Sequence, residues 1–281
     1  MTRILTGDSR TLLGTLPAGS VQCCVTSPPY YGLRDYGVAG QMGQESSPAE
    51  YVVDMVALFR EVRRVLADDG TLWLNLGDSY GKDKQRLMIP ARVALGLQTD
   101  GWVLRDEIIW HKPRTTPSPV KDRTVAAHEM FYLLTKQPTY YFDYLAIEEP
   151  SLYPGLVKKA GKAFRDLVKI DPKAAAKRNN DTREITVRDT KRKRSVWSVS
   201  PSPYNDAHFA TFAPGLVEPC ILAGSRPGDT VLDPFGGAGT TGLVADRLGR
   251  SAVLIELNPA YAALGQKRIT SDCPMFAEAV G

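Results

Sequence analysis

Apolar runs alternate along the chain with segments whose apolar residues recur at helical spacing. The runs Val21–Thr26 and Thr71–Leu76, each followed by turn residues, predict strands that are buried on both faces. Between them, the spacing of apolar residues predicts a helix over Tyr51–Leu66 that stops at Asp68-Asp69-Gly70. Strands that alternate with helices are typical of an α/β protein with a mostly parallel sheet.

The remaining elements continue this alternation. We expect a strand at Ile4-Leu5, helices over Leu87–Leu97 and Pro214–Ala223, a strand within Trp102–Trp110, aromatic-rich strands at Glu129–Leu134 and Tyr140–Asp143, and a strand–turn–helix–strand unit over Thr230–Leu257. The unit over Thr230–Leu257 gives the clearest indication of a ligand-binding site.

Length and composition indicate a globular protein with a substantial core. The chain has 281 residues, of which 43% are hydrophobic and 23% charged, which excludes a disordered or fibrous protein. No apolar run approaches the roughly 18 residues of a membrane span, and Met1–Asp8 lacks a signal-peptide core, so we expect a cytoplasmic protein without a membrane partner. The four cysteines form no CxxC pair and the three histidines have no ligand spacing, so we expect neither a disulfide scaffold nor a metal site.

Positive charge is concentrated in one segment. Between Lys158 and Arg194 the sequence has 14 Lys and Arg against five Asp and Glu, a local charge of +9 in a chain whose total is +4. A basic block on an otherwise acidic protein is the electrostatic pattern expected of a polyanion-binding protein. A solvated insertion would show the same charge, so the pattern needs support from other residues.

A glycine-rich turn follows the strand that starts at Thr230. Asp233 ends this strand, and the glycines from Gly236 to Gly242 precede a helix whose free N–H groups can face a ligand. Glu256 ends the next apolar strand, 20 residues after Gly236, where an acid can bind the ribose hydroxyls of a nucleoside cofactor.

Two features of this turn argue against a nicotinamide dinucleotide. The carboxylate of Asp233 would repel a pyrophosphate but suits a cationic or amino-acid-bearing ligand. Only 48 residues follow Asp233, too few for a dinucleotide-binding domain, so the remaining strands must come from the N-terminal part of the chain. A phosphate-binding P-loop also fails, because no Lys-Ser/Thr pair follows the last glycine.

A second motif follows the buried strand Val21–Thr26. In Ser27-Pro28-Pro29-Tyr30 the two prolines fix the backbone, so that the Ser27 hydroxyl and the Pro28 carbonyl can both accept hydrogen bonds from an exocyclic amino group. The Tyr30 ring offers a face on which a flat base taken out of a duplex can stack. A simple Pro-Pro turn with a packed tyrosine is the competing interpretation.

Together, Val25–Tyr30 and Asp233–Thr241 resemble the motifs of the β-class DNA amino-methyltransferases, which modify cytosine N4 or adenine N6 with S-adenosylmethionine. In that family the catalytic motif precedes the cofactor motif and a target-recognition region lies between them. The resemblance therefore implies a circularly permuted, Rossmann-like methyltransferase fold with a mostly parallel sheet and a basic target-recognition insertion. It implies a catalytic half at residues 1–143, a target-recognition region at 144–200 and a cofactor-binding half at 201–281.

The resemblance also implies roles for individual residues. It assigns catalysis to Ser27, Pro28, Pro29 and Tyr30, an adenine contact to Asp8, a ribose contact to Glu256, and the rest of the cofactor cradle to Asp233, Phe235, Gly236, Gly237, Gly239, Thr240 and Thr241. The segment 208–218 is similar to the family's helix-leading motif beside the cofactor. Lys112, Lys121 and Arg123 resemble the family segment along the target-base pocket and phosphate path, and the basic block adds Lys191, Arg192, Lys193 and Arg194 as DNA-binding residues.

The first residue of the catalytic motif bears on the target base. In the family it is typically Asp or Asn for adenine N6 and Ser for cytosine N4, so Ser27 favours cytosine N4, with adenine N6 as the alternative. A carbon-5 enzyme would use a Pro-Cys nucleophile, but Pro219-Cys220 lies in a predicted helix without a Glu-Asn-Val partner, and we expect Cys220 in the core.

The resemblance implies double-stranded DNA as the partner. It also admits a homodimer and a cognate restriction enzyme. A catalytically silent DNA-binding module remains a further alternative, which cofactor binding would distinguish.

Overall fold

The computed structural model describes residues 1–115, 118–159, 184–201 and 212–272. The chain divides into two compact units. The larger unit consists of Met1–Asp143 and Arg194–Gly281, and the smaller one of Tyr144–Lys193.

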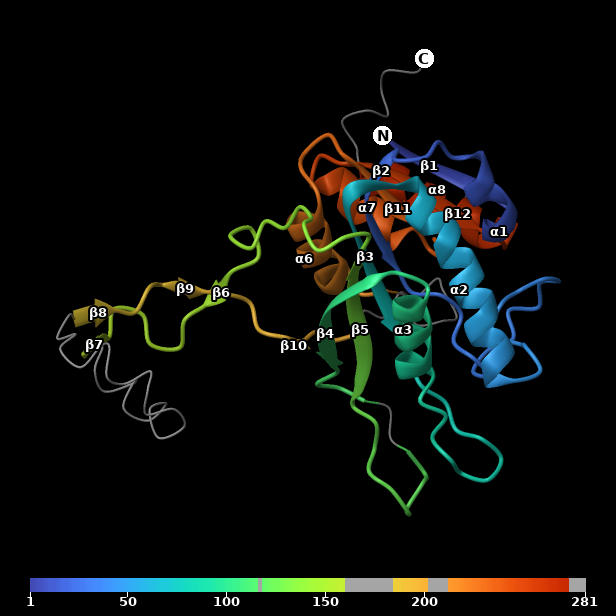
Figure 1. The fold of residues 1–281 in the computed structure, drawn as a ribbon, viewed down its shortest axis with the longest axis horizontal. Helices are drawn as coiled ribbons and strands as arrows, with labels where there is room; N and C mark the ends of the chain where they lie inside the picture. Colours follow the sequence, from blue (N-terminus) through green and yellow to red (C-terminus); the bar gives the residue numbers. More distant parts are fainter. Residues whose placement is uncertain (116–117, 160–183, 202–211, 273–281) are drawn as a thin grey trace. The chain divides into compact units, whose positions relative to one another are not determined.

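The described residues of the larger unit form one sheet of eight strands in the order β1-β12-β11-β2-β3-β5-β4-β10 (Figure 1). The strands are β1 (Thr2–Thr6), β2 (Val21–Thr26), β3 (Leu66–Leu76), β4 (Val103–His111), β5 (His128–Thr135), β10 (Val196–Ser198), β11 (Thr230–Asp233) and β12 (Ser251–Glu256). β5 is antiparallel to both of its neighbours, and every other pairing in this sheet is parallel. The predicted α/β class with a mostly parallel sheet is confirmed.

Helices cover both faces of the sheet. On one face α2 (Pro48–Val65) packs against α3 (Ile89–Thr99), beside the short α1 (Ser9–Leu12) and the 3-10 turn η1 (Leu13–Thr15). On the other face α6 (Pro214–Gly224) packs against α7 (Thr240–Arg247), which contacts α8 (Pro259–Asp272). Figure 1 shows α2 and α3 side by side next to the strands.

The adjacent cysteines of β2 face the helices on opposite sides of the sheet. Cys24 belongs to the apolar cluster under α2 and α3. The thiol of Cys23 faces α6, where it lies 3.8 Å from the carbonyl oxygen of Cys220. Both side chains are fully buried, as expected for a strand that is covered on both faces.

The long helix α2 begins earlier than the predicted Tyr51. Ser47 caps it, with its hydroxyl oxygen 3.2 Å from the backbone nitrogen of Glu50, and Pro48 occupies the first turn. The helix ends at Val65, and β3 starts at the next residue. The prediction of a helix stop at Asp68-Asp69-Gly70 is therefore wrong: these residues form an irregularity of β3, between its pairings with Val21 and Cys23 of β2.

The predicted strand at Tyr140–Asp143 is also wrong. This segment is irregular, and its backbone makes two separate contacts, from Tyr141 nitrogen to the Asp69 carbonyl and from Asp143 nitrogen to the Ala223 carbonyl. The Phe142 ring lies 6.2 Å from the Trp73 ring. The aromatic residues that suggested a strand therefore serve to pack this segment onto the sheet.

The smaller unit has two antiparallel strand pairs, β6 (Glu149–Pro150) with β9 (Thr190–Lys191), and β7 (Val157–Lys159) with β8 (Glu184–Thr186). Much of the basic block lies outside the described residues. The catalytic half (1–143), target-recognition region (144–200) and cofactor-binding half (201–281) that the resemblance implied stay predictions. β10, which falls within the predicted recognition region, pairs with β4 in the main sheet.

Gly224 at the end of α6 yields a test of this packing. A β-carbon there would lie 2.4 Å from the hydroxyl of Thr71 and 2.9 Å from the thiol of Cys23. We expect Gly224→Ala to lower the free energy of unfolding by about 1–3 kcal/mol, because the added methyl group overpacks the core. Gly14→Ala is the control, since nothing lies within 4 Å of its β-carbon position. Denaturant unfolding should show a lower free energy of unfolding for Gly224→Ala but not for Gly14→Ala. Equal stabilities of the two variants would contradict the close packing of Gly224 against Thr71 and Cys23.

Candidate active site

Four strand ends meet at one edge of the sheet. β1, β12, β11 and β2 are neighbours and parallel, so the residues that follow their carboxyl ends lie close together. These residues line a cavity of about 440 Å³. The Ser27–Tyr30 segment and the turn after Asp233 therefore border the same cavity, although they are more than 200 residues apart in the sequence.

Asp233 connects the two motifs. Its side chain is 3% exposed and accepts hydrogen bonds of 2.7 Å from the hydroxyls of Thr26 and Thr241, which lie in β2 and α7. Burial raises the pKa of Asp233 to about 6, and the hydrogen bonds to the carboxylate oppose this rise. At neutral pH the cavity therefore contains a negative charge at the start of the glycine turn.

The glycine turn presents its backbone to the cavity. Phe235, Gly236 and Gly237 all line the cavity, and the Gly236 nitrogen donates to the Ile255 carbonyl of β12 at 2.8 Å. Gly239 does not line the cavity. It adopts φ +76 at the start of α7, and a β-carbon there would lie 3.0 Å from Gly265 of α8. Its conformation and this close helix contact explain the glycine, and its predicted part in the cofactor cradle stays a prediction.

Thr240 and Thr241 begin α7 and also line the cavity. Thr241 is held by Asp233, as described above. The Thr240 hydroxyl accepts a 2.8 Å hydrogen bond from Arg268 of α8. The structure therefore places both predicted residues at the cavity wall, with their hydroxyls in contacts that fix the turn.

Two further acids of the prediction lie on the same wall. The carboxylate of Glu256 accepts from the backbone nitrogens of Gly237 at 2.7 Å and Asn258 at 2.8 Å, and burial raises its pKa. Asp8 caps α1 and forms an ion pair with Arg10, at 2.6 Å, whose hydrogen bonds lower the pKa of Asp8. Glu256 is the last residue of β12 and Asp8 follows β1, so both acids lie at the carboxyl ends of parallel strands.

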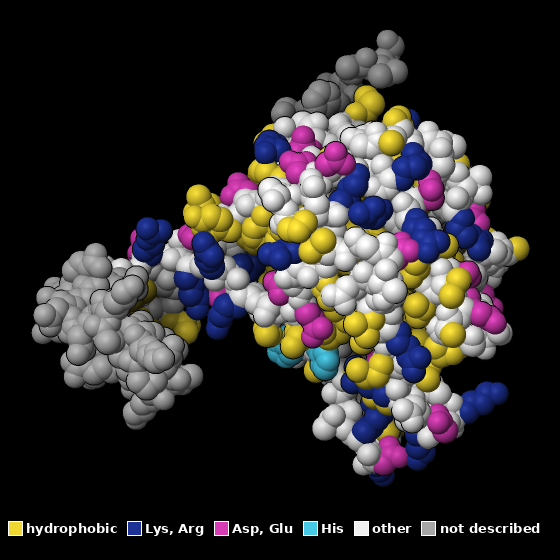
Figure 2. Space-filling model, in the orientation of Figure 1, with side chains coloured by type: hydrophobic (Ala, Val, Ile, Leu, Met, Phe, Trp, Pro, Cys, Tyr) yellow, Lys and Arg dark blue, Asp and Glu magenta, His cyan; other side chains and the backbone are white. Residues whose placement is uncertain are grey.

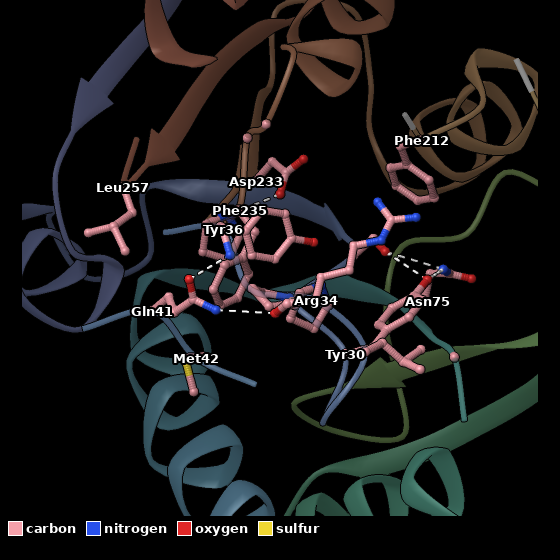
Figure 3. Close-up of a pocket in the computed structure, with 18 of the residues that line it drawn as sticks. Tyr30, Arg34, Tyr36, Gln41, Met42, Asn75, Phe212, Asp233, Phe235 and Leu257 are labelled. Atoms are coloured by element: carbon pink, nitrogen blue, oxygen red, sulfur yellow. Dashed lines mark hydrogen bonds between the residues drawn. The ribbon is translucent and has the colours of Figure 1, made fainter. Parts of the chain in front are cut away.

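The predicted catalytic motif also lines the cavity. Ser27, Pro28, Pro29 and Tyr30 all border it, and the Tyr51 hydroxyl of α2 donates to the Pro29 carbonyl at 2.9 Å. The Tyr30 ring packs against Gly77, where a β-carbon would lie 2.5 Å from a ring carbon. Figure 3 shows Tyr30 and Asn75 around the same cavity as Asp233 and Phe235.

Asn75 and Glu129 are two cavity residues that were not predicted from the sequence. Tyr30 donates to Glu129 at 2.8 Å, Asn75 Nδ2 lies 3.0 Å from the same oxygen, and Lys112 forms an ion pair with Glu129. The buried Oδ1 of Asn75 has no hydrogen-bond partner among the described residues. A signal was present, because Asn75 is a lone amide in the apolar run Thr71–Leu76.

The loop between β2 and α2 was also missed. Arg34, Tyr36, Gln41 and Met42 line the cavity, and Gln41 holds the loop by accepting from the Tyr36 nitrogen at 2.7 Å (Figure 3). The sequence gives little indication of this contact, because the loop has neither helical nor strand periodicity.

The predicted DNA-binding residues occupy three places. Lys112 lies in the cavity, where its ammonium group is 4.3 Å from the centre of the Trp110 ring. Lys121 and Arg123 border a shallow hollow, with the Arg123 guanidinium 4.1 Å from the Tyr80 ring centre.

The basic block supplies the third place. In the smaller unit, Lys191 pairs with Glu149 at 3.4 Å, Arg192 lies 4.6 Å from the Tyr144 ring centre, and Lys193 ends the unit. Lys and Arg side chains gather on the described part of this unit (Figure 2), while Arg194 belongs to the larger unit. DNA binding by these residues stays a prediction.

Cys220 lies apart from the cavity. It is fully buried in α6, and its thiol lies 3.2 Å from the Leu216 carbonyl. The expectation that it is a core residue is confirmed, and no cysteine is among the described residues that line the cavity.

No group of three or more His, Cys, Asp or Glu side chains among the described residues is arranged to hold a metal ion. No described helix combines the length and apolar character that crossing a membrane requires.

Comparison with solved structures supports the fold. A cytosine-N4-specific PvuII DNA methyltransferase superposes with a TM-score of 0.70 at 23% identity, covering 96% of this chain and 90% of that one. A putative DNA modification methylase from Thermus thermophilus, solved with S-adenosyl-L-methionine, superposes with a TM-score of 0.65 at 26% identity, covering 98% and 96%. These likenesses agree with the Rossmann-like methyltransferase fold that the sequence motifs implied.

Comparison of sequences identifies the family. The type II methyltransferase M.SmaI of Serratia marcescens is 42% identical over 295 residues, covering 95% of this chain and 90% of the relative. M.XycI of Xanthomonas campestris pv. cyanopsidis is 40% identical over 291 residues, covering 94% and 86%. The family model described as DNA methylase matches residues 21–267, a range that includes both the Ser27–Tyr30 segment and the glycine turn. This chain belongs to the DNA methylase family.

Proposed function

We propose that this chain transfers a methyl group from S-adenosylmethionine to N4 of a cytosine that has been flipped out of double-stranded DNA. The observation that carries the proposal is the meeting of two motifs around one cavity. The Ser27–Tyr30 segment and the Asp233 turn line the same space and are joined by the 2.7 Å hydrogen bond between Thr26 and Asp233.

The part of the cavity beside the glycine turn suits S-adenosylmethionine. The carboxylates of Asp233 and Glu256 match a cationic amino acid and ribose hydroxyls, and Asp8 lies on the same wall. Flat apolar walls come from Tyr36, Phe235 and Tyr261. When bound, S-adenosylmethionine supplies an electrophilic methyl group attached to sulfur.

The residues of the catalytic motif orient the exocyclic amino group of the base, which receives the methyl group. The lone pair of an exocyclic amino nitrogen is delocalised into the base, so the free amine is a weak nucleophile. Ser27 Oγ and the Pro28 carbonyl would each accept one N–H and draw the nitrogen toward a tetrahedral shape, with its lone pair directed away from both. The nitrogen would form a bond to the methyl carbon while the carbon–sulfur bond breaks, which leaves a neutral thioether, and the nitrogen would then release one proton to water. Correct positioning accounts for most of the rate.

Access to the amino group requires the base to leave the duplex. Enzymes that act on a base inside DNA flip it into a pocket and hold it between flat side chains. Trp110, Tyr30 and Phe212 line the cavity, Tyr30 next to Ser27, and Phe212 stacks on Phe131 at 6.0 Å. These rings support a pocket for a single base.

The choice of cytosine N4 over adenine N6 rests on residue 27. Ser is the residue that the family typically uses for cytosine N4, and Ser27 lines the cavity. Since the relatives named above are type II methyltransferases, we include a cognate restriction enzyme in the proposal. A homodimer stays a prediction from the resemblance.

Substitution of Ser27 tests the catalytic assignment. Ser27→Ala removes the acceptor for one N–H, so methyl transfer to DNA should fall about 10²–10³-fold while the affinity for S-adenosylmethionine stays close to that of the wild type. Incorporation of tritiated methyl groups into DNA measures the rate. Ser20→Ala is the control, because Ser20 is exposed and its hydroxyl donates to the nearby Pro17 carbonyl, outside the cavity. A fully active Ser27→Ala enzyme would refute the assigned site.

Substitution of Glu256 tests the ribose contact. Glu256→Ala should weaken S-adenosylmethionine binding by about 10–100-fold, since hydrogen bonds to a charged group contribute about 1.5–3 kcal/mol. Isothermal titration calorimetry measures the affinity, and circular dichroism checks that the variant is folded. An unchanged dissociation constant in the folded variant would count against this contact.

The pKa of Asp233 gives a test that depends on pH. The carboxyl group is neutral below its pKa of about 6 and negatively charged above it, so the affinity for a cationic ligand should rise several-fold as pH increases through about 6. Asp233→Asn removes the titrating group and should flatten most of this rise. Calorimetric titrations with S-adenosylmethionine across this pH range compare the two proteins. Equal pH dependence in both would argue that Asp233 does not contact the ligand.

A further inference from the structure

Glu129, at the start of β5, accepts hydrogen bonds from three side chains that are separated in the sequence. The Tyr30 hydroxyl donates to Oε2 at 2.8 Å, Asn75 Nδ2 lies 3.0 Å from the same oxygen, and Lys112 pairs with Oε1. The Glu129 side chain is only 16% exposed. Because an ionised carboxylate can only accept hydrogen bonds, it fixes the direction of each of these bonds.

The direction of the Tyr30 bond determines that of the next one. Tyr30 has a single hydroxyl proton, which it donates to Glu129, and burial raises the pKa of Tyr30 so that this proton is retained. The hydroxyl oxygens of Ser27 and Tyr30 lie 3.1 Å apart. Since the proton of Tyr30 is already used, Ser27 must be the donor in this bond.

Ser27 is then left with lone pairs only. Asn75 Nδ2 lies within hydrogen-bond distance of the Tyr30 hydroxyl and of Glu129, and 3.3 Å from Ser27 Oγ, so its two protons are shared among three acceptors and occupy at most one lone pair of Ser27. The other lone pair is available to the cavity that Ser27 lines. Asn75 is held in this orientation by the same carboxylate, because its amide oxygen would be repelled by Glu129. The three bonds therefore convert a hydroxyl group, which can donate or accept, into one that accepts.

Whether the Ser27 hydroxyl donates or accepts a hydrogen bond matters when an amino nitrogen is to receive the methyl group. A hydroxyl that donated to the target nitrogen would occupy the lone pair that must attack the methyl group. A hydroxyl that accepts binds an N–H and leaves this lone pair free. We propose that Glu129 is a positioning residue that, through Tyr30, holds Ser27 as a hydrogen-bond acceptor toward the target amino group. This inference rests on the proposed function.

The Glu129→Gln substitution tests the inference with little change of shape. A glutamine amide can donate to the Tyr30 oxygen, which releases the Tyr30 proton toward Ser27 and turns the Ser27 proton toward the cavity. We expect kcat for DNA methylation to fall about 10²-fold, as for loss of one oriented hydrogen-bonding group. KM for DNA and the dissociation constant of S-adenosylmethionine should stay within about twofold, because no ligand contact is lost.

The control for this variant is Glu107→Gln. Glu107 is exposed on the neighbouring strand β4 and lies outside the cavity, so its kinetics should equal those of the wild type. If Glu129 only supported the loop, its substitution would weaken DNA and cofactor binding together with kcat. That pattern, or an unchanged kcat, would overturn the inference.

Tyr30→Phe provides an independent test, which also applies if Glu129→Gln does not fold. Removing the Tyr30 hydroxyl should lower kcat to a similar extent with little change in KM. In the Tyr30→Phe background, Glu129→Gln should reduce kcat by less than about twofold more, because coupled residues are not additive. A wild-type kcat in Tyr30→Phe, or fully additive losses, would contradict the relay. Absence of methyl transfer by the wild-type protein would instead refute the proposed function.

Discussion

The hydrogen bonds that two threonine hydroxyls donate to one buried carboxylate join the parts of the chain on which the site depends. Thr26 and Asp233 are 207 residues apart in sequence but end neighbouring parallel strands, and Thr241 completes the contact from the helix that follows the turn. A buried carboxylate is costly unless it is well hydrogen-bonded, so the two halves of the site stabilise each other. The same contact places Ser27 and the glycine turn around one cavity.

The features that follow from strand order could be predicted from the sequence. Continuous apolar runs identified β2 and the last two strands, and the residues after buried parallel strands converge at their carboxyl ends. This rule, together with the resemblance, was enough to bring Ser27, Asp233 and Glu256 to one site. The core position of Cys220 also followed, because its helix is apolar over most of its length.

The features that depend on register could not be predicted. Glu129 reaches Tyr30 only because β5 is antiparallel to β3 with Leu76 opposite Met130, and single-sequence periodicity does not specify such a pairing across 54 residues. The aromatic residues of Tyr140–Asp143 resembled a strand because aromatic side chains favour half-buried surfaces of any kind. The stop at Asp68-Asp69-Gly70 was misassigned because acidic residues and glycine occur in strand irregularities as well as at helix ends.

The central claim is that one cavity holds a flipped cytosine with its amino group directed by Ser27 toward the methyl donor. The most direct test is to incubate the purified protein with S-adenosylmethionine carrying a labelled methyl group and unmethylated DNA of mixed sequence, and then to digest the DNA to nucleosides for mass spectrometry. The account predicts label in N4-methyl-2′-deoxycytidine. Label in N6-methyladenine nucleosides would contradict the assignment of the base, and label in 5-methylcytosine nucleosides would contradict the mechanism itself.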